Sequence, residues 1–393
     1  MELPLGIYAV IILLSLFIII YRKEKKDHNK NVKSIPIRIW VNGTRGKSSV
    51  TRLIAAGLRA GNKKVIAKTT GTSPRFISSN KIEKIVQRLG MPNIREQIKI
   101  FRKSTQYKPD AIVLECMALR PDLQRIESIE IVQPTLAVIT NVRADHLDIM
   151  GPTLKDAART FIEVLPKKCR LFLAEKHIFD DFSELLQQKN IELMTSKTKD
   201  ISDSVMEKFS YIEHKENVVL ALDVCEYFNV REKIALEGMY NSNPDPGALK
   251  AYHLELNGKE ITFVNAMAAN DPDSTCYIWQ KIDKNYAEIN VLINCRSDRI
   301  DRSMQFANMT KNHLGADHYI LTGNGTRVLE KHLRKNISKN KITDLGRREP
   351  KYVADSIAAL VSNKSMVFAI GNTVGYGIIL LNQLLKHRRN HVN

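Results

Sequence analysis

From Pro36 onward, short apolar runs rich in β-branched residues alternate with amphipathic stretches. The first run, IRIWV at 37–41, has the length of a strand, and SSVTRLIAAGLRAG after it has helical apolar spacing and ends at Gly61. Four further runs of strand length follow: KKVIAKTT, PDAIVLEC, TLAVITN and RLFLAE. Strands separated by helical stretches predict a parallel sheet covered by helices, and therefore an α/β domain at 36–237.

This alternation is interrupted by GMYNSNPDPGA at 238–248. The segment is rich in Gly, Pro and Asn, which is typical of a hinge between domains. Four more apolar runs come after it: EITFVNA, INVLINC, HYILTG and MVFAIG. They predict a smaller, Rossmann-like α/β domain at 249–393.

The amino-terminal stretch LPLGIYAVIILLSLFIIIY, residues 3–21, carries no charge and is about as long as one bilayer crossing requires. A cleaved signal peptide is the alternative, but it would need positive charge before the apolar run and a small-x-small site after it. Here the only early charge is Glu2, and the run ends in Ile-Tyr-Arg-Lys. We therefore expect an uncleaved transmembrane helix at 1–21.

A basic segment, which we expect to be a juxtamembrane linker, follows at 22–35. Its cations are Arg22, Lys23, Lys25, Lys26, Lys30 and Lys33. Because basic flanks face the cytoplasm, the pattern predicts a single-pass protein of the cell membrane, with its amino terminus outside and both α/β domains in the cytoplasm.

The formal net charge is +18 over 393 residues, which favours an anionic partner. No zinc-finger spacing and no RNA-binding aromatic signature is present, so nucleic acid is not the predicted partner. The five cysteines are scattered and none forms a C-x-x-C pair, which argues against a disulfide scaffold or a zinc site.

The stretch VNGTRGKS at 41–48 lies between the first predicted strand and its helix. Gly43 and Gly46 would let the backbone turn tightly and present N–H groups to an anion, and Lys47 would reach the β- and γ-phosphates of a nucleotide. The alternative is a tight turn with an exposed lysine. The context favours an ATP-binding loop, with these residues: Gly43, Thr44, Arg45, Gly46, Lys47, Ser48 and Ser49.

Two oxygen donors suggest how Mg²⁺ would be held. Ser48 would supply a hydroxyl from the loop, and Glu115 ends the predicted strand AIVLE. A carboxylate at that position is what a P-loop enzyme needs to hold the metal, directly or through water.

The usual P-loop has glycine where this chain has Val41, and G-T-R-G-K-S resembles the loop of the Mur ligase superfamily, in which that glycine is commonly replaced. NVRADHLD at 141–148 resembles the N-x-x-x-D-H-x-D element of the same family. The resemblance implies that Lys47, Glu115 and His146 are catalytic, with His146 contacting a second Mg²⁺.

GMYNSNP at 238–244 resembles the G-x-H-N-x-x-N element of that family, with Tyr240 in place of the histidine. The resemblance implies that Asn241 contacts the adenine of ATP.

Candidate substrate residues are less clearly marked. INCRSDRIDRSMQF at 293–306 carries three arginines, Arg296, Arg299 and Arg302, which form either a salt-bridged surface loop or a site for carboxylate or phosphate. Together with Thr69 and Thr70, they are candidates for holding substrate carboxylates.

Only about 14 residues separate the apolar stretch from the first strand, which leaves no room for the UDP-sugar domain of Mur ligases proper. Over essentially the whole chain, the motifs resemble the ATP-binding ligase subunits of poly-γ-glutamate synthases. They are R-G-K-S, T-T-G-T, E-C-M, D-H-L-D-I-M-G-P-T, N-P-D-P-G-A and N-C-R-x-D-R-x-D-R.

This resemblance implies an ATP-dependent amide ligase that polymerises glutamate through an acyl phosphate, with ATP and Mg²⁺ as cofactors. L- or D-glutamate and the growing poly-γ-glutamate chain would be its substrates, and a small multi-pass membrane subunit with accessory subunits its partners. Two alternatives stay open: a membrane-tethered regulatory or transport ATPase without ligase activity, and a ligase like folylpolyglutamate synthase. The oligomeric state is also open, a homo-oligomer included.

Overall fold

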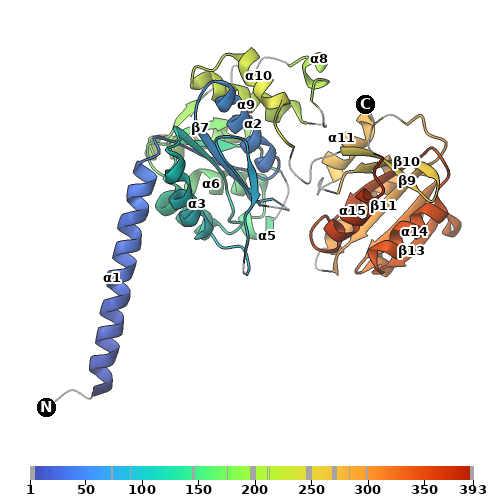
Figure 1. Ribbon diagram of the computed structural model, residues 1–393, viewed down its shortest axis with the longest axis horizontal. Helices are drawn as coiled ribbons and strands as arrows, with labels where there is room; N and C mark the ends of the chain where they lie inside the picture. The colour runs from blue at the N-terminus through green and yellow to red at the C-terminus, as the bar shows by residue number, and fades with distance from the viewer. Residues whose placement is uncertain are drawn as a thin grey trace. The chain divides into compact units, whose positions relative to one another are not determined.

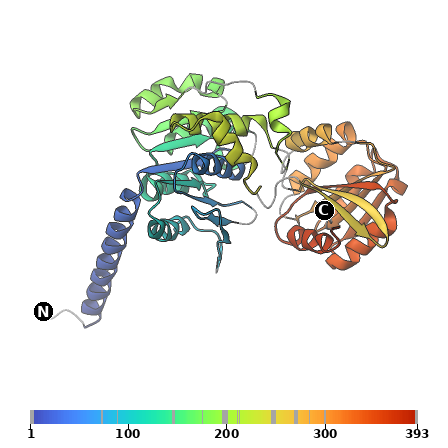
Figure 2. The same cartoon turned by 45° about the horizontal axis from the view of Figure 1, so that its top comes forward.

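The computed structural model describes residues 5–71, 74–88, 90–143, 147–174, 176–194, 201–209, 211, 213–244, 250–267, 272–282, 284–297 and 300–389. The chain forms two compact units, each with its own sheet (Figures 1 and 2). The first unit comprises Met1–Phe209 with Glu213–Asp245, and the second comprises Ser210–Ile212 with Pro246–Asn393.

The first unit is built on an eight-stranded sheet of order β4-β3-β2-β5-β1-β6-β7-β8. The strands from β2 to β8 in this order pair in parallel, and β3 and β4 form an antiparallel edge. The strands are β1 (Ile37–Asn42), β2 (Val65–Thr69), β3 (Arg75–Ile77), β4 (Glu83–Ile85), β5 (Ala111–Glu115), β6 (Leu136–Ile139), β7 (Arg170–Leu173) and β8 (Glu192–Met194). The predicted parallel α/β architecture is confirmed.

Helices cover both faces of this sheet (Figure 1). The helical segments are α1 (Leu5–Lys33), α2 (Lys47–Ala60), α3 (Glu96–Ser104), η1 (Thr105–Tyr107), α4 (Pro121–Ile126), η2 (Glu127–Val132), α5 (Leu147–Met150), α6 (Leu154–Glu163), η3 (Lys176–Phe182), α7 (Ser183–Gln188), α8 (Asp203–Met206), α9 (Lys215–Tyr227) and α10 (Glu232–Tyr240).

Alternation along β1 and β5 explains how both faces become buried. Successive side chains of a strand point to opposite faces, and every residue from Ile39 to Val41 is buried. Both faces of β1 are therefore covered. Trp40 packs in one core with Leu114 of β5, Phe101 of α3 and Phe161 of α6. Because both faces are covered, these strands read as continuous apolar runs, which is the pattern of a buried parallel sheet.

The second unit has a six-stranded sheet of order β13-β12-β11-β14-β10-β9, parallel except for the edge pair β10–β9. Its strands are β9 (Lys250–Leu256), β10 (Lys259–Asn265), β11 (Ile289–Cys295), β12 (His318–Gly323), β13 (Ile342–Gly346) and β14 (Ser365–Gly371). Its helical segments are α11 (Pro272–Lys281), α12 (Ile300–His313), α13 (Thr326–Leu333), η5 (Lys339–Lys341), α14 (Pro350–Leu360) and α15 (Tyr376–Leu385). Separate apolar clusters lie on its two faces.

The amino-terminal segment differs from its prediction. In the described part of the chain, no helix is both long enough and apolar enough to cross a membrane, so the expected transmembrane span is not supported. The basic segment expected to be a linker is helical, since α1 continues without a break to Lys33. The physical reason is packing: His28 and Val32, near the carboxyl end of α1, are buried.

Candidate active site

The loop between β1 and α2 requires glycine at Gly43. Its φ is +125°, and a Cβ built there would lie 2.3 Å from Thr140 Oγ1. Gly46 also has a positive φ, +74°, and a Cβ there would lie 2.7 Å from Asn217 Oδ1. Both glycines are therefore dictated by local geometry, as the motif predicted.

The segment after β6 fixes the shape of this loop. Asn141 accepts from the Thr44 N–H through its backbone oxygen (3.0 Å) and from the Arg45 N–H through Oδ1 (2.9 Å). Thr140 Oγ1 donates to the Arg45 carbonyl (2.5 Å). Because these two loop amides are directed at Asn141, we expect an anion to be met by the first-turn amides of α2, which lack partners within the helix.

Lys47, the first residue of α2, folds back over the loop. Its Nζ donates to the carbonyls of Gly43 (2.6 Å) and Thr44 (3.1 Å). Internal carbonyls thus hold the ammonium group at the loop, where it can move to a phosphate when one binds.

Ser48 and Glu115, two of the three predicted metal ligands, are in direct contact. Ser48 Oγ donates to Glu115 Oε2 at 2.8 Å, and the Thr70 N–H donates to the same oxygen at 2.5 Å. The pairing arises because β5 lies between β1 and β2, so its carboxyl end meets both the loop and the end of β2. A hydroxyl beside a carboxylate is a hard-oxygen pair that suits Mg²⁺, so these residues fit the metal.

Thr69 and Thr70, the predicted substrate threonines, differ in exposure. Thr70 is half-buried, and besides its N–H contact its Oγ1 donates to the Cys116 carbonyl (3.4 Å). Thr69 is fully buried in β2, so its side chain is not placed to receive a glutamate carboxylate.

The remaining predicted residues are only partly described. His146 and Arg299 lie outside the described residues, and of Arg302 only the backbone, within α12, is described. Arg296 directly follows β11 and is half-buried.

Asn241, the predicted adenine contact, is exposed at the carboxyl end of α10, and its amide donates to the Glu237 carbonyl (2.8 Å). Within the described part of the chain, no hydrogen bond joins Asn241 to the loop. Asn217 of α9 also lies against the loop, where it faces Gly46.

Sequence reasoning missed Asn217 and its partner Glu213. Glu213 is buried and accepts from Asn217 Nδ2 (2.8 Å) and the His214 N–H (3.0 Å). Burial raises the pKa of the Glu213 carboxyl, and these hydrogen bonds partly oppose the rise. The available signal was an acidic residue and an asparagine four positions apart at the start of a helical pattern, which is common in ordinary helices.

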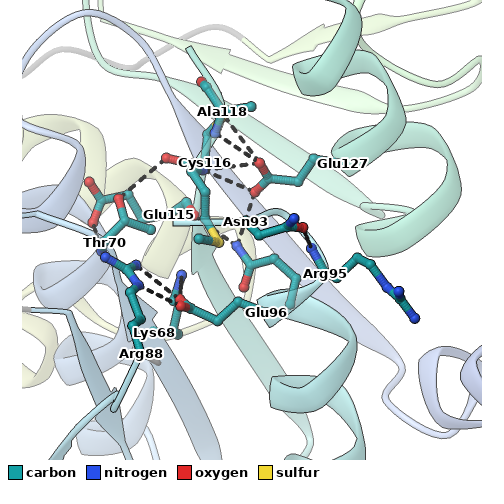
Figure 3. Close-up of polar contacts among 12 residues, drawn as sticks. Lys68, Thr70, Arg88, Asn93, Arg95, Glu96, Glu115, Cys116, Ala118 and Glu127 are labelled. Atoms are coloured by element: carbon teal, nitrogen blue, oxygen red, sulfur yellow. Dashed lines mark hydrogen bonds and ion pairs between the residues drawn. The ribbon is translucent and has the colours of Figure 1, made fainter. Parts of the chain in front are cut away.

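A second missed group surrounds the backbone that follows Glu115 (Figure 3). Glu127, the first residue of η2, is fully buried and accepts from the N–H groups of Met117 and Ala118. Gln97 of α3 donates to Glu127 Oε1 (3.0 Å) and to the Glu115 carbonyl (3.1 Å).

A buried ion pair lies on the same side of the sheet (Figure 3). Lys68 of β2 is fully buried, and its Nζ is 2.7 Å from Glu96 Oε1. Arg88 also binds Glu96, at 2.6 Å. Desolvation lowers the pKa of Lys68, and Glu96 opposes that shift.

Comparisons with known proteins agree with this geometry. Residues 41–243 match the Mur ligase middle domain, and residues 251–387 match the poly-gamma-glutamate synthase CapB C-terminal domain. The chain is 35% identical over 382 residues to the capsule biosynthesis protein CapB of Bacillus anthracis, covering 95% of this chain and 82% of that protein. It is 33% identical over 387 residues to PGA synthase CapB of Bacillus subtilis (strain 168), covering 97% and 98%.

Solved structures share the fold at low sequence identity. Escherichia coli FolC in complex with DHPP and ADP has a TM-score of 0.65 at 17% identity, covering 91% of this chain and 90% of that chain. The bifunctional folylpolyglutamate synthase/dihydrofolate synthase with Mn, AMPPNP and L-glutamate bound has a TM-score of 0.63 at 14% identity, covering 93% of both chains. With a Mur-type loop, a Ser48–Glu115 pair and near-full-length relatives, the chain belongs to the poly-gamma-glutamate synthase CapB family of Mur-type, ATP-dependent amide ligases.

Proposed function

We propose that the chain uses ATP to join glutamate units into poly-γ-glutamate. The main support is the sequence identity of 33–35%, over nearly the whole of this chain, to two CapB proteins, one of which is named PGA synthase. The site supports it, because a P-loop, a lysine at its end and a serine–glutamate pair are the parts that phosphoryl transfer from ATP requires.

The reaction has two steps. An oxygen of the terminal γ-carboxylate attacks the γ-phosphorus of ATP, the bond between that phosphorus and the β–γ bridging oxygen breaks, and ADP leaves with the bond electrons. The product is an acyl phosphate. The neutral amine of the next glutamate then attacks the acyl carbon, and the tetrahedral intermediate expels phosphate and loses the amine proton. One amide forms for each ATP consumed.

Both steps concentrate negative charge, so the protein's main task is positioning and electrostatic stabilisation. In this proposal Lys47 leaves the Gly43 and Thr44 carbonyls and binds the β- and γ-phosphates. The first-turn amides of α2 meet the phosphate oxygens at the positive end of the helix dipole. Rigid holding of the loop by Asn141 keeps these donors in place.

Ser48 and Glu115 would hold Mg²⁺, and His146 would contact a second ion. When bound, the metal would neutralise negative charge on the γ-phosphoryl group during its transfer. The Ser48–Glu115 contact of 2.8 Å supports the first assignment, and the family resemblance supports the second.

Glutamate recognition is the less constrained part of the proposal. Arg296, Arg299 and Arg302, with the half-buried Thr70, are the candidates for its carboxylates, since arginine binds carboxylate in a bidentate fork.

We further propose that the chain acts at the cell membrane, with both α/β units on the cytoplasmic side and a small multi-pass subunit and accessory subunits as partners. The support is α1, whose apolar side chains from Val10 to Tyr21 are 41–67% exposed. Six cations follow them at 22–33, which favours contact with anionic lipid head groups.

Flotation with phosphatidylserine-containing vesicles tests this attachment. Replacing Leu13, Phe17 and Ile20 together with serine should shift the protein from the vesicle fraction to the soluble fraction. Val328→Ser, which changes an exposed apolar residue of α13, is the control and should float like the wild type. Equal flotation of the triple variant would refute attachment through α1.

ADP release by the complete complex tests the ligase proposal. Release should depend on glutamate and should be abolished by Lys47→Ala, which removes the cation aimed at the phosphates. Turnover that is independent of glutamate would instead favour the regulatory or transport ATPase. Release that requires a pteroate acceptor would favour a folylpolyglutamate-synthase-like ligase.

A further inference from the structure

Glu127 is a buried carboxylate for which the reaction itself has no use. It is fully buried at the start of η2, whose hydrogen bonding is π-helical, a rare conformation that is frequent near functional sites. It lies 12 residues beyond Glu115 in the sequence, yet the fold brings it to the turn that follows Glu115.

Both oxygens of Glu127 are used (Figure 3). Oε1 accepts from Gln97 Nε2 (3.0 Å) and Met117 N (3.1 Å), and Oε2 accepts from Met117 N (3.0 Å) and Ala118 N (3.1 Å). Trp40 Nε1 lies 3.4 Å from Oε1. Burying a carboxylate is costly unless such donors surround it, so the side chain is held at this place by the backbone that it binds.

That backbone carries the proposed metal ligand. Met117 and Ala118 directly follow Glu115 and Cys116, so their N–H groups fix the path of the chain as it leaves β5. Gln97 links Glu127 to Glu115, because its side-chain amide nitrogen donates both to the Glu127 carboxylate and to the Glu115 carbonyl. The turn after Glu115 is therefore held through its backbone from one side.

The side chain of Glu115 is held by the backbone that follows β2. The Thr70 N–H donates to Glu115 Oε2, and two residues earlier Lys68 is anchored to Glu96 at 2.7 Å. Glu96 and Gln97 are neighbours on α3, so one helix braces both the β2 end and the β5 end. Glu115 is thus fixed in its backbone and in its side chain.

We propose that Glu127 is a positioning residue for the divalent-cation site: by binding the Met117 and Ala118 amides it sets the Glu115 carboxylate toward Ser48 Oγ. The inference rests on the proposed function of Ser48 and Glu115. Residues that orient metal ligands without touching the metal typically change its affinity by about 10–100-fold when altered.

Glu127→Gln is the sharpest variant because it keeps the size of the side chain. A glutamine offers one acceptor oxygen, and its NH₂ group would then face a backbone N–H or the Gln97 amide. We expect Mn²⁺ binding to the ADP-loaded protein, followed by electron paramagnetic resonance without turnover, to weaken by about tenfold. The Mg²⁺ concentration that half-saturates ADP release should rise by a similar factor.

Glu130→Gln is the matched control. It makes the same chemical change three residues further along η2, at an exposed residue paired with Lys25 at 3.3 Å, and should bind Mn²⁺ like the wild type. ADP binding measured in EDTA should be equal in the wild type and in Glu127→Gln. This readout separates a metal-positioning role from general loss of the fold.

Wild-type Mn²⁺ affinity in Glu127→Gln would overturn the proposal, as would an equal loss of ADP binding in EDTA. If Glu127→Gln does not fold, Gln97→Leu tests the proposal in its place. It removes the amide that donates to both Glu127 and Glu115, and should also weaken Mn²⁺ binding. Absence of glutamate-dependent turnover in the wild type would refute the proposed function and leave the Mn²⁺ comparison intact.

Discussion

At the scale of single residues, the loop glycines show how closely this site is packed. Gly43 faces Thr140 and Gly46 faces Asn217, each too near for an added Cβ. The contact partners lie about 100 and 170 positions away in the sequence, so the loop is shaped by two distant segments as well as by its own motif.

Gly43→Ala tests this shaping. The positive φ strains any L side chain by about 1–3 kcal/mol, and the Cβ would also displace Thr140. We expect ADP affinity, measured by calorimetry, to fall at least about tenfold, because 1.4 kcal/mol of loop distortion corresponds to that factor.

Gly258→Ala is the control for backbone strain alone. Gly258 has φ +75°, and a Cβ added there would meet no heavy atom within 4 Å, so the substitution carries the conformational cost without a clash. Its ADP affinity should match that of the wild type. Unchanged affinity in Gly43→Ala would contradict the packing argument.

Residues of the site differ in how far the sequence could predict them. Gly43, Lys47, Ser48 and Glu115 follow from a local motif and a strand end, because parallel strands bring their carboxyl ends to one edge. Glu127 and Asn217 could not be predicted this way. Glu127 binds backbone N–H groups of the turn after β5, and backbone groups carry no sequence signature. Asn217 faces a glycine about 170 positions away, and its pairing with Glu213 four residues before it is common in ordinary helices.

At the scale of elements, α1 has an extent that the hydrophobic pattern did not predict. Its apolar half and its basic half look like two segments in the sequence, yet they form one helix. The basic half has its own partners. Glu24 pairs with Arg95, which directly precedes α3, at 2.8 Å, and His28 Nε2 donates to the Ile131 carbonyl of η2 at 2.8 Å. Polar composition alone could not reveal these contacts.

The His28 contact predicts a pH dependence. Burial lowers the pKa of His28 below its ordinary value of 6.5, while the hydrogen bond to Ile131 and the nearby Glu24 partly oppose this. The unfolded chain therefore takes up the proton first as pH falls. The contribution of His28 to stability is present above pH 6.5 and is lost as pH falls from 6.5 toward the lower folded pKa.

Thermal melts of the wild type and of His28→Ala between pH 7.5 and 5 test this. At pH 7.5 the variant should be less stable by about 1–2 kcal/mol, from the lost hydrogen bond and the edge contact with Phe101. The difference should shrink as pH falls. A difference that is constant or grows would show that His28 is not the titrating group.

At the scale of the whole molecule, two α/β units with separate cores share one strongly basic chain. The sequence predicted both α/β units because most of their central strands are largely apolar runs between helical stretches, whereas the short or polar edge strands β3, β4, β8 and β9 lack that pattern. The +18 net charge suits a polyanionic product, although solvated surface lysines contribute much of it.

Binding of poly-γ-glutamate should therefore weaken with ionic strength. Exposed charges are screened over about 10 Å at 0.1 M salt and over about 3 Å at 1 M, so retention on immobilised polymer should fall steeply across this range. Retention that does not respond to salt would show that the net charge has no part in binding the product.

Isotope transfer from the carboxylate to phosphate tests whether the amide forms through an acyl phosphate. A glutamate oligomer with ¹⁸O at both oxygens of its terminal γ-carboxylate is supplied with ATP and with glutamate labelled in the same way, and the released phosphate is analysed by mass spectrometry. An acyl phosphate intermediate predicts one ¹⁸O atom in the phosphate for each amide formed, because the attacking carboxylate oxygen leaves with the phosphorus. Phosphate that gains no ¹⁸O from the carboxylate while ATP is consumed would contradict it.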